Sequence, residues 1–401
     1  VYAPVNSALA NLDPAIANNA DRLKIFVGNH IAQQLYRTAD VPVLTRIGML
    51  NNKYNNIKSS QIGDAVIKTA DKYASNGLLQ VIDKSLSAID NCWEVLSANA
   101  DVPAGQKSFM LSLFRNVFDT SNAIVTGINP TTGEPIYQPG SDSVYTNLFW
   151  NRVHDLKNET KQYTLFVLAD AAWDAEVAKF KPYYVVTGNV DSNTLVTSWN
   201  VVKDFAVDTV YNPASIPDTI VSKFGTKLPV ERSAIVKTIK TSNGIVYIMN
   251  KMNVLPSSKI ATIRIEGENY TASSHDRRGN TYFRDRLNTI TGLDFRDVFV
   301  TGHGVTAFNL RYQLQEIPSV KYKAYWVAYN DVPSLTLSQR LVIGSTASTT
   351  FPLTSVPANS FNEQYIGEFT MTKYEPLYNI YLVANGTNPI LCDYIKLVPS
   401  L

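Results

Sequence analysis

The chain has 401 residues, of which 45% are hydrophobic and 17% are charged. That length exceeds what one hydrophobic core usually organises, so we expect two or three domains, and the composition excludes a disordered polyelectrolyte. The 36 Lys and Arg residues against 34 Asp and Glu residues leave a formal net charge of +2, too small to supply the basic field that nucleic-acid binding needs. With only Cys92 and Cys392, a disulfide scaffold or a thiolate metal cluster is also excluded.

The first residues, VYAPVNSALA, lack the basic start and the apolar stretch of a secretion signal, and no apolar run is long enough to span a membrane. We therefore expect no membrane insertion in this segment. Because the chain opens on Val1 inside a repeated unit, we interpret it as a fragment, and a lipid anchor upstream of Val1 stays open.

Two pairs of similar blocks indicate an internal repeat. Val1–Leu9 lines up with Leu165–Trp173, and Ala65–Lys84 lines up with Ala234–Lys251. The distance from the front block to the back block is nearly the same in both copies, which accidental matches would not be expected to preserve. The chain therefore holds two copies of one unit.

Each front block predicts a strand that runs into a helix. Apolar residues precede Asn6 or Asp170 and small helix formers follow, so we expect that side chain to cap the first free amides of the helix. Helical patterns at Ala32–Arg37 and Thr219–Phe224 follow before the back blocks. Each unit therefore mixes helices with a sheet, as an α+β module does.

Each back block predicts a β-hairpin. Apolar runs flank a turn that ends in Asn-Gly, the strongest short-range signal for a hairpin. The residues are Asn76 and Gly77 in the first copy and Asn243 and Gly244 in the second.

These blocks resemble fasciclin domains. The front motif of that family, a strand followed by Pro-Thr-Asp/Asn-Ala-Ala/Phe, corresponds to Ala3–Leu9 and Val167–Trp173. Its back motif, an Asn-Gly hairpin that ends in a Val-Ile-Asp-Lys type of strand, corresponds to Asn76–Lys84 and, more loosely, to Asn243–Lys251. The resemblance implies adhesion only by analogy, because a fold does not fix a function.

The family often has a Tyr-His pair between the two motifs. Asn29-His30-Ile31 fits this pair in the first copy, whereas Asp204-Phe205-Ala206 stands there in the second copy. The second copy has therefore lost the histidine. The resemblance implies structural roles for the motif residues Asn6, His30, Asn76, Gly77, Asp170, Asn243 and Gly244.

We expect three domains, at residues 1–103, 104–255 and 256–401. The first is a fasciclin-like domain without the helical residues that precede the front motif in this family. The second has such a helix predicted at Ser108–Asp119, followed by a Gly- and Pro-rich surface loop at Thr126–Ser141.

From Ile260 onward, helical spacing nearly disappears and short strand-like runs follow one another. Many short strands separated by turns predict an all-β sandwich, and we expect a jelly roll. The runs are Ala261–Ile265, Val298–Thr301, Val305–Tyr312, Tyr322–Tyr329, Gln339–Ile343, Tyr365–Met371, Tyr378–Ala384 and Leu391–Val398.

The two ends of this domain resemble galactose-binding, jelly-roll carbohydrate-binding modules. Ile263–Tyr270 is similar to their opening strand and Cys392–Pro399 to their closing strand, whereas His275–Phe295 matches no known pattern. The resemblance implies that the domain binds a glycan.

Three carboxylates near these ends are candidate ligands for a structural calcium ion. Glu266 and Glu268 fall two apart on one strand, so both project from one face, and Asp393 joins them if the first and last strands are neighbours. Calcium takes six to eight oxygen ligands, and only three candidate side chains are visible here. A solvated strand face is the competing interpretation. No other cofactor is expected.

Aromatic side chains of the same domain are candidates for stacking on a sugar ring. We predict ligand binding by Tyr282, Arg284, Trp326 and Tyr322. Tyr322 and Trp326 share one strand face, and Tyr325 and Tyr329 share the other. One of these faces must be core, so packing is the competing interpretation for half of them.

The sequence shows no catalytic motif: zinc-binding spacing, a nucleophile elbow and a phosphate loop are all missing. We therefore predict a non-catalytic extracellular or cell-surface adhesion protein, from a bacterial envelope, whose partner is a glycan or a surface protein. A structural module that contacts proteins alone is the alternative. A glycan hydrolase would need a carboxylate pair such as Glu363 with Asp393 in a cleft.

Overall fold

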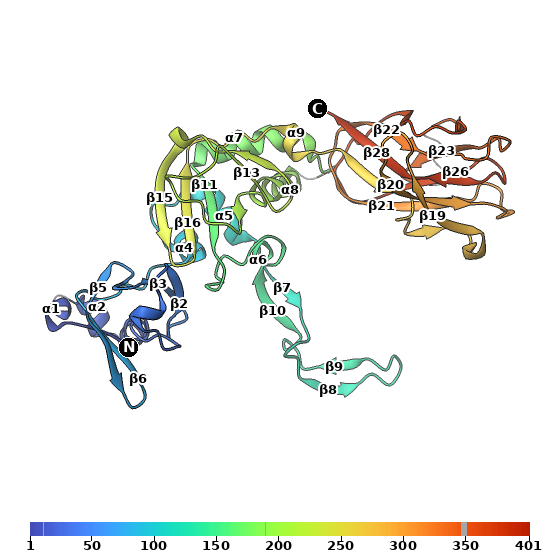
Figure 1. The fold of residues 1–401 in the computed structure, drawn as a ribbon. Helices are drawn as coiled ribbons and strands as arrows, with labels where there is room; N and C mark the ends of the chain where they lie inside the picture. The colour runs from blue at the N-terminus through green and yellow to red at the C-terminus, as the bar shows by residue number, and fades with distance from the viewer. Residues whose placement is uncertain (11, 189, 346–350) are drawn as a thin grey trace. The chain divides into compact units, whose positions relative to one another are not determined.

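The computed structural model describes residues 1–401 except 11, 189 and 346–350 (Figure 1). The chain forms two compact units, one of Val1–Glu176 with Val201–Asn253 and the other of Val177–Asn200 with Val254–Leu401. Within the described residues, no helix is both long enough and apolar enough to cross a membrane.

The N-terminal part of the first unit is a six-stranded sheet with three short helices. The order of the strands is β1-β6-β5-β4-β3-β2. Its core includes the buried side chains of Tyr2, Ile47, Met49 and Ile82. The elements are β1 (Tyr2–Pro4), α1 (Asn6–Leu9), α2 (Pro14–Ala17), α3 (Ala20–Gly28), β2 (Thr45–Gly48), β3 (Tyr54–Lys58), β4 (Gln61–Ile62), β5 (Ala65–Ala74) and β6 (Gly77–Ile82).

The next part is built on a four-stranded sheet of order β12-β11-β16-β15. Helix α4, which the predicted boundary at residue 103 places in the first domain, is hydrogen-bonded to the turn before β16 through the Cys92 N–H and Asn243 Oδ1, 2.8 Å apart. The elements are α4 (Cys92–Ala98), α5 (Ala104–Ser112), β7 (Phe114–Phe118), β8 (Val125–Ile128), β9 (Pro135–Tyr137), β10 (Ser143–Asn147), α6 (Leu148–Arg152), β11 (Tyr163–Leu168), α7 (Asp170–Phe180), α8 (Val190–Val202), β12 (Ala206–Val207), β13 (Thr219–Val221), β14 (Lys227–Pro229), β15 (Ile235–Thr241) and β16 (Gly244–Met249).

Both predicted hairpins are confirmed. Strand β5 pairs with β6 through Ala74 and Gly77, and β15 pairs with β16 through Thr241 and Gly244. In each hairpin the glycine is the first residue of the second strand, and the turn consists of the Ser-Asn pair before it.

The two copies also share the pairing of the front strand. Strand β1 pairs in parallel with β6, and β11 pairs in parallel with β16. Tyr2 lies opposite Gln80 and Phe166 lies opposite Tyr247, which are equivalent positions in the two repeats. The repeated blocks therefore fold with one register.

Backbone contacts around the front strands are repeated as well. The Tyr2 N–H donates to the His30 carbonyl and the Phe166 N–H donates to the Phe205 carbonyl, both at 2.8 Å. Phe205 thus occupies the backbone position of His30, although its side chain cannot form the same hydrogen bonds.

Several local predictions for this region are wrong. The helix expected at Ser108–Asp119 ends at Ser112, because Phe114–Phe118 forms strand β7 and pairs with β10. Thr126–Ser141 is not a plain loop, since it contains most of the β8–β9 hairpin. Neither Ala32–Arg37 nor Thr219–Phe224 is helical.

The predicted helix caps differ from the structure. Asn6 is the first residue of α1 rather than its cap, and Val5, which precedes it, provides no side-chain cap. Asp170 begins α7, but its Oδ1 accepts a hydrogen bond from the Gly105 N–H at 2.7 Å, in the first turn of α5. Asp170 therefore ties two helices together.

His30 has a structural place in the first copy. The ring is buried, its Nε2 accepts a hydrogen bond from the Leu86 N–H at 2.8 Å, and its Nδ1 lies 2.8 Å from the Phe26 carbonyl. Because Nε2 accepts, Nδ1 must carry the proton and donate to Phe26. Burial lowers the pKa of His30, against the raising effect of the Phe26 carbonyl.

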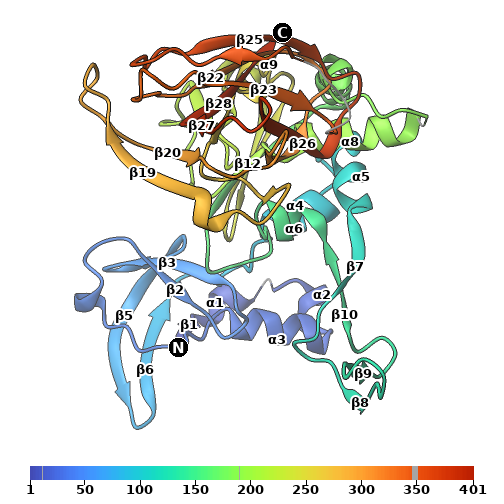
Figure 2. The same ribbon diagram turned by 90° about the vertical axis from the view of Figure 1, so that its right-hand side faces the viewer.

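Among the described residues from Ile260 onward, the regular elements are strands apart from one 3-10 turn at Arg278–Asn280, which confirms the all-β prediction for this region (Figure 2). A four-stranded sheet of order β17-β28-β22-β25 and a five-stranded sheet of order β18-β21-β26-β23-β24 share one core, and a third sheet has the order β19-β20-β27. The elements are α9 (Pro256–Lys259), β17 (Ile263–Glu266), β18 (Ala272–Ser273), β19 (Thr281–Leu287), β20 (Asp294–Val300), β21 (Asn309–Ile317), β22 (Lys321–Val327), β23 (Ser338–Ile343), β24 (Thr354–Ser355), β25 (Gln364–Thr370), β26 (Glu375–Ala384), β27 (Ile390–Cys392) and β28 (Tyr394–Ser400).

Gly244 should be essential where Gly77 is not. A Cβ atom at Gly244 would lie 1.9 Å from the Tyr163 carbonyl oxygen, and its φ of +151° disfavours other residues, whereas nothing lies within 4 Å of a Cβ at Gly77. We expect Gly244→Ala to lower the free energy of unfolding by about 3 kcal/mol or more. Gly77→Ala should change it by less than about 1 kcal/mol. Urea unfolding of both variants measures this, and equal effects would contradict it.

His30 should make stability depend on pH. A histidine whose pKa is lowered by folding contributes stability above its unfolded pKa of about 6.5, and this contribution is lost as the pH falls below that value. Protonation also removes the acceptor of the Leu86 N–H, which costs about 1 kcal/mol or more. We expect His30→Gln to flatten the fall in melting temperature between pH 7 and pH 5. The exposed His275→Gln serves as the control, and an unchanged slope in His30→Gln would refute the assignment.

Candidate functional site

The alternation of side chains along strand β22 determines which of its aromatic rings face the core and which face the surface. Tyr322 and Trp326 point inward and are fully buried in the shared core. Tyr322 stacks on Phe369 with ring centroids 5.5 Å apart, and the Trp326 Nε1–H donates to Gln364 Oε1 at 2.9 Å. The prediction that these two residues bind ligand is therefore wrong, because they fill the core.

The opposite face of the same sheet carries three tyrosines that are not in the core. Tyr325 of β22 lies directly opposite Tyr365 of β25, and their ring centroids are 5.4 Å apart. Tyr394 of β28 lies further along this face, with the guanidinium carbon of Arg264 3.7 Å from its ring centroid. Tyr365 is 51% exposed. Neighbouring strands thus place aromatic rings side by side at the surface.

Charged groups hold these rings in place. Both oxygens of Glu363 accept hydrogen bonds from Lys396 Nζ at 2.7 Å, and one also accepts from the Tyr394 hydroxyl at 2.8 Å. Although partial burial opposes it, hydrogen bonding by Lys396 and Tyr394 lowers the pKa of Glu363. We call this surface the tyrosine face and define it by Arg264, Tyr325, Glu363, Tyr365, Tyr394 and Lys396.

The tyrosine face combines two properties that sugar recognition needs. Tyrosine offers a flat apolar ring with a polar tip, and the fixed carboxylate and ammonium groups beside it supply acceptors and donors for hydroxyl groups. Sequence reasoning placed Tyr325 on the alternate face of β22 but could not assign that face to solvent. Tyr365 and Tyr394 were missed, since only the pairing of three strands brings them together.

The hairpin of β19 and β20 carries the other two predicted ligand residues. Tyr282 is 49% exposed, as a contact residue would be. Arg284 is instead engaged within the protein: it forms a bidentate pair with the buried Asp297, at 2.8 and 2.6 Å, and bonds Asp331 at 3.1 Å. The structure therefore gives Arg284 a role in holding the hairpin.

A second aromatic cluster lies beside Asp331 and was also missed from the sequence. The rings of Tyr329 and Phe361 are stacked 4.0 Å apart, and Phe295 meets Phe361 edge to face at 5.8 Å. Arg286 lies 5.2 Å from the Tyr329 ring centroid and bonds Asp331. The three rings of this cluster are all half-buried, whereas the tyrosine face includes the exposed ring of Tyr365.

The three predicted calcium ligands have different environments. Glu266 is paired with Arg264 at 2.7 Å, whereas Glu268 Oε2 and Asp393 Oδ1 are buried and have no hydrogen-bond partner. Burial raises the pKa of Asp393 to about 7, and Glu266, Asp297 and Glu268 add to the rise while Arg264 opposes it. Among the described residues, no three His, Cys, Asp or Glu side chains are grouped to hold a metal ion.

The carboxylates suggested for hydrolysis are also separated by environment. Glu363 is bound to Lys396 and Tyr394 on the tyrosine face, and Asp393 is buried next to Cys392 at the end of β27. A glycosidase instead presents two carboxyl groups to one substrate across a cleft.

Comparisons with known proteins agree with part of the sequence interpretation. Residues 1–88 match the model of the fasciclin domain. A search of the curated proteins found no match. The family match does not extend beyond residue 88, so a tandem pair of fasciclin domains stays a prediction.

Solved structures similar to this chain are carbohydrate-binding modules with a jelly-roll fold or contain one. They include the GH26-CBM35 β-(1,4)-mannanase of Podospora anserina, with 17% identity over 35% of this chain and 28% of that chain and a TM-score of 0.27. A CBM36-1 domain of a multidomain xylanase from the hindgut metagenome of Trinervitermes trinervoides has 17% identity over 35% and 99%, with a TM-score of 0.26. A family 35 module from Clostridium thermocellum has 13% identity over 35% and 99%, with a TM-score of 0.25.

Proposed function

We propose that this chain is a non-catalytic adhesion protein of the cell surface whose C-terminal sandwich binds a glycan. The observation that carries the proposal is the tyrosine face. It places the exposed ring of Tyr365 beside the half-buried rings of Tyr325 and Tyr394, with fixed hydrogen-bonding groups next to them, on the face of the sheet that faces away from the core. A bacterial envelope is the location that we propose, with residues 1–255 as the part that presents the sandwich.

We also propose that residues 104–255 are a diverged second fasciclin domain. The equal register of β1–β6 and β11–β16 supports this, as do the repeated bonds to the His30 and Phe205 carbonyls. A further match is the bond from the residue after each front strand, which runs from Val5 N to Ile82 O and from Ala169 N to Met249 O.

A second candidate function is protein-protein adhesion. The ribbon formed by β7 to β10 extends from α6 (Figure 1) and exposes large apolar side chains. They are Phe118, Ile124, Val125, Ile128, Ile136, Val144 and Tyr145. Contiguous exposed apolar groups are a mark of contact surfaces, so this ribbon favours a protein partner in addition to the glycan.

The glycan proposal predicts that the tyrosine face is the binding surface. We expect the full chain to bind a glycan on an array, and Tyr365→Ala to weaken that binding at least tenfold, or about 1.4 kcal/mol, because a stacking ring is lost. Tyr381→Ala, on a strand of the other sheet, is the matched control and should bind normally. An array with no binding by folded protein, or equal losses in both variants, would contradict the proposal.

We further propose that Glu268 and Asp393 belong to a structural calcium site. Two buried carboxylate oxygens without partners fit a hard cation that binds oxygen, although most of its six to eight ligands would have to come from elsewhere. Calcium should raise the melting temperature of chelator-treated protein, because a ligand that binds only the folded state stabilises it. Magnesium should not do so to the same extent, and Asp393→Asn should abolish the effect. A calcium titration with no heat and no thermal shift refutes the site.

A further inference from the structure

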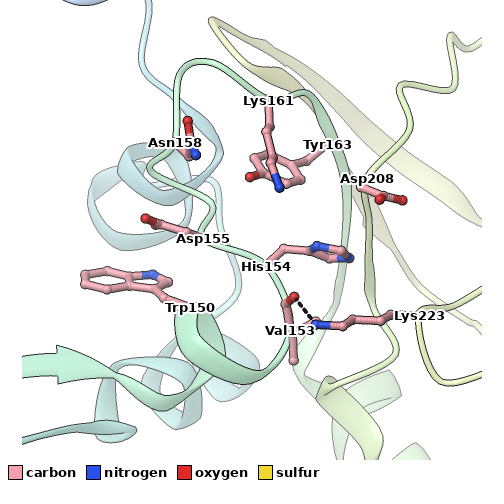
Figure 3. Close-up of a pocket in the computed structure, with 9 residues that line it drawn as sticks. All are labelled: Trp150, Val153, His154, Asp155, Asn158, Lys161, Tyr163, Asp208 and Lys223. Carbon is pink, nitrogen blue, oxygen red and sulfur yellow. Dashed lines mark hydrogen bonds between the residues drawn. The ribbon is translucent and has the colours of Figure 1, made fainter. Parts of the chain in front are cut away.

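A polar pocket of about 440 Å³ opens among residues of the first compact unit (Figure 3). Its residues come from three segments of the chain, which are residues 150–163, Asp208 and Lys223. Trp150 is on α6, a loop before β11 carries five of the others, Tyr163 begins β11, and Asp208 and Lys223 follow β12 and β13. The loop residues are Val153, His154, Asp155, Asn158 and Lys161.

The loop that forms most of the pocket is fixed by the second hairpin. The buried Asn243 donates from Nδ2 to the Leu156 carbonyl at 2.9 Å and to the Asn158 carbonyl at 3.2 Å. Leu156 itself is buried, and Asp155 and Asn158 each close a short turn by accepting the backbone N–H two residues on. The pocket is therefore built on an ordered loop.

Two residues that line the pocket are buried, and one of its lysines already forms hydrogen bonds within the protein. Val153 and Tyr163 are buried. Lys223 Nζ donates to the Arg152 and Val153 carbonyls at 2.9 and 3.0 Å, and Figure 3 shows the bond to Val153. The Lys223 ammonium group thus binds the carbonyls at the C-terminal end of α6. Lys161 is the other ammonium group at the pocket, and it is the one that a ligand can bind.

Three groups around the pocket lack partners. In the part of the chain that the structure describes, neither Lys161 nor Asp208 forms a hydrogen bond or an ion pair. His154 Nε2 is buried without a partner, and burial lowers the pKa of His154, with Lys223 and Lys161 adding to the fall and Asp208 opposing it. The ring is therefore neutral near pH 7 and can donate or accept one hydrogen bond.

The arrangement of charges restricts the ligand. Asp155 and Asp208 lie on opposite sides of His154, and Lys161 extends from the loop beside Tyr163 (Figure 3). Two carboxylates repel a phosphate or any other multiply charged anion. A single ammonium group could satisfy only one of the two acidic sides, whereas hydroxyl groups spaced around a ring can donate to both. One carboxylate on that ring would match Lys161.

We infer that this pocket binds a carboxylated monosaccharide of the hexuronate class. Lys161 binds the carboxylate, and Asp155 and Asp208 accept hydrogen bonds from ring hydroxyls. Asn158 donates from its amide nitrogen, since its side-chain oxygen already accepts from the Thr160 N–H and hydroxyl. This site is separate from the tyrosine face and does not depend on the glycan proposal for the sandwich.

Calorimetric titration of the full chain with D-glucuronate tests the inference. D-glucose, which lacks the carboxylate, and glycine, which has a carboxylate and an ammonium group but no hydroxyls, are the comparison probes. We expect glucuronate to bind and both comparison probes to bind at least tenfold more weakly. Lys161→Met and Asp208→Asn should each weaken glucuronate binding at least tenfold. Lys240→Met, an exposed lysine on β15, is the matched control and should leave it unchanged.

Each other outcome overturns a stated part of the inference. If glucose binds as tightly as glucuronate, Lys161 does not bind a carboxylate of the ligand. If glycine binds more tightly than glucuronate, the ligand is not a sugar. If no probe gives a heat of binding and circular dichroism shows that the protein is folded, the proposed site is refuted. If Tyr365→Ala abolishes the heat and Lys161→Met does not, glucuronate binds the tyrosine face instead, so failure of this site is distinguishable from failure of the sandwich proposal.

Discussion

The parallel pairing of β11 with β16, the second strand of the β15–β16 hairpin, is the constraint on which the structure around this sheet depends. It brings the start of β11 so close to the start of β16 that only glycine fits at residue 244. The same pairing places Asn243 under the loop before β11, where its amide group bonds two loop carbonyls. Tyr163, the first residue of β11, then becomes the floor of the pocket. Backbone pairing, loop and pocket are therefore consequences of one register.

In the sandwich, the alternation of side chains along β22 is the constraint that determines the surface available for binding. A tyrosine or tryptophan buries a large area, so the sheet must direct one aromatic face inward. Tyr322 and Trp326 take the core, and their hydrogen bonding and stacking needs are met by Gln364 and Phe369. Tyr325, one residue away from Trp326, is left at the surface. Because Tyr322 and Trp326 fill the core, the alternation along β22 places Tyr325 on the opposite, tyrosine face of the sheet.

Features that are local in sequence could be predicted, and features that depend on tertiary pairing could not. The hairpins follow from Asn-Gly between apolar runs, and the strand-rich last third follows from β-branched and aromatic runs. The sequence of β22 is aromatic on both faces, so only the pairing with β25 and β28 decides which face is buried. Arg284 looked like a free contact because its partners, Asp297 and Asp331, are distant in the chain.

The wrong predictions for the second domain have a similar cause. Residues 114–118 have helical spacing, but pairing with β10 overrides a local preference of that size. Asp170 is placed to cap its own helix by sequence, yet its oxygen bonds the start of α5, which no local pattern indicates. The pocket could not be found from sequence, because its residues come from segments that only the sheet brings together.

His30 and Phe205 occupy equivalent backbone positions beside the strands β1 and β11. Both residues are buried and both accept the same backbone hydrogen bond from the front strand. The side chain of His30 additionally satisfies the Leu86 N–H and the Phe26 carbonyl, whereas Phe205 fills its place with an apolar ring. The fold therefore needs the carbonyl at this position and not the imidazole. At residue 30 the imidazole meets two local hydrogen-bonding groups, whereas at residue 205 an apolar ring occupies the corresponding backbone position.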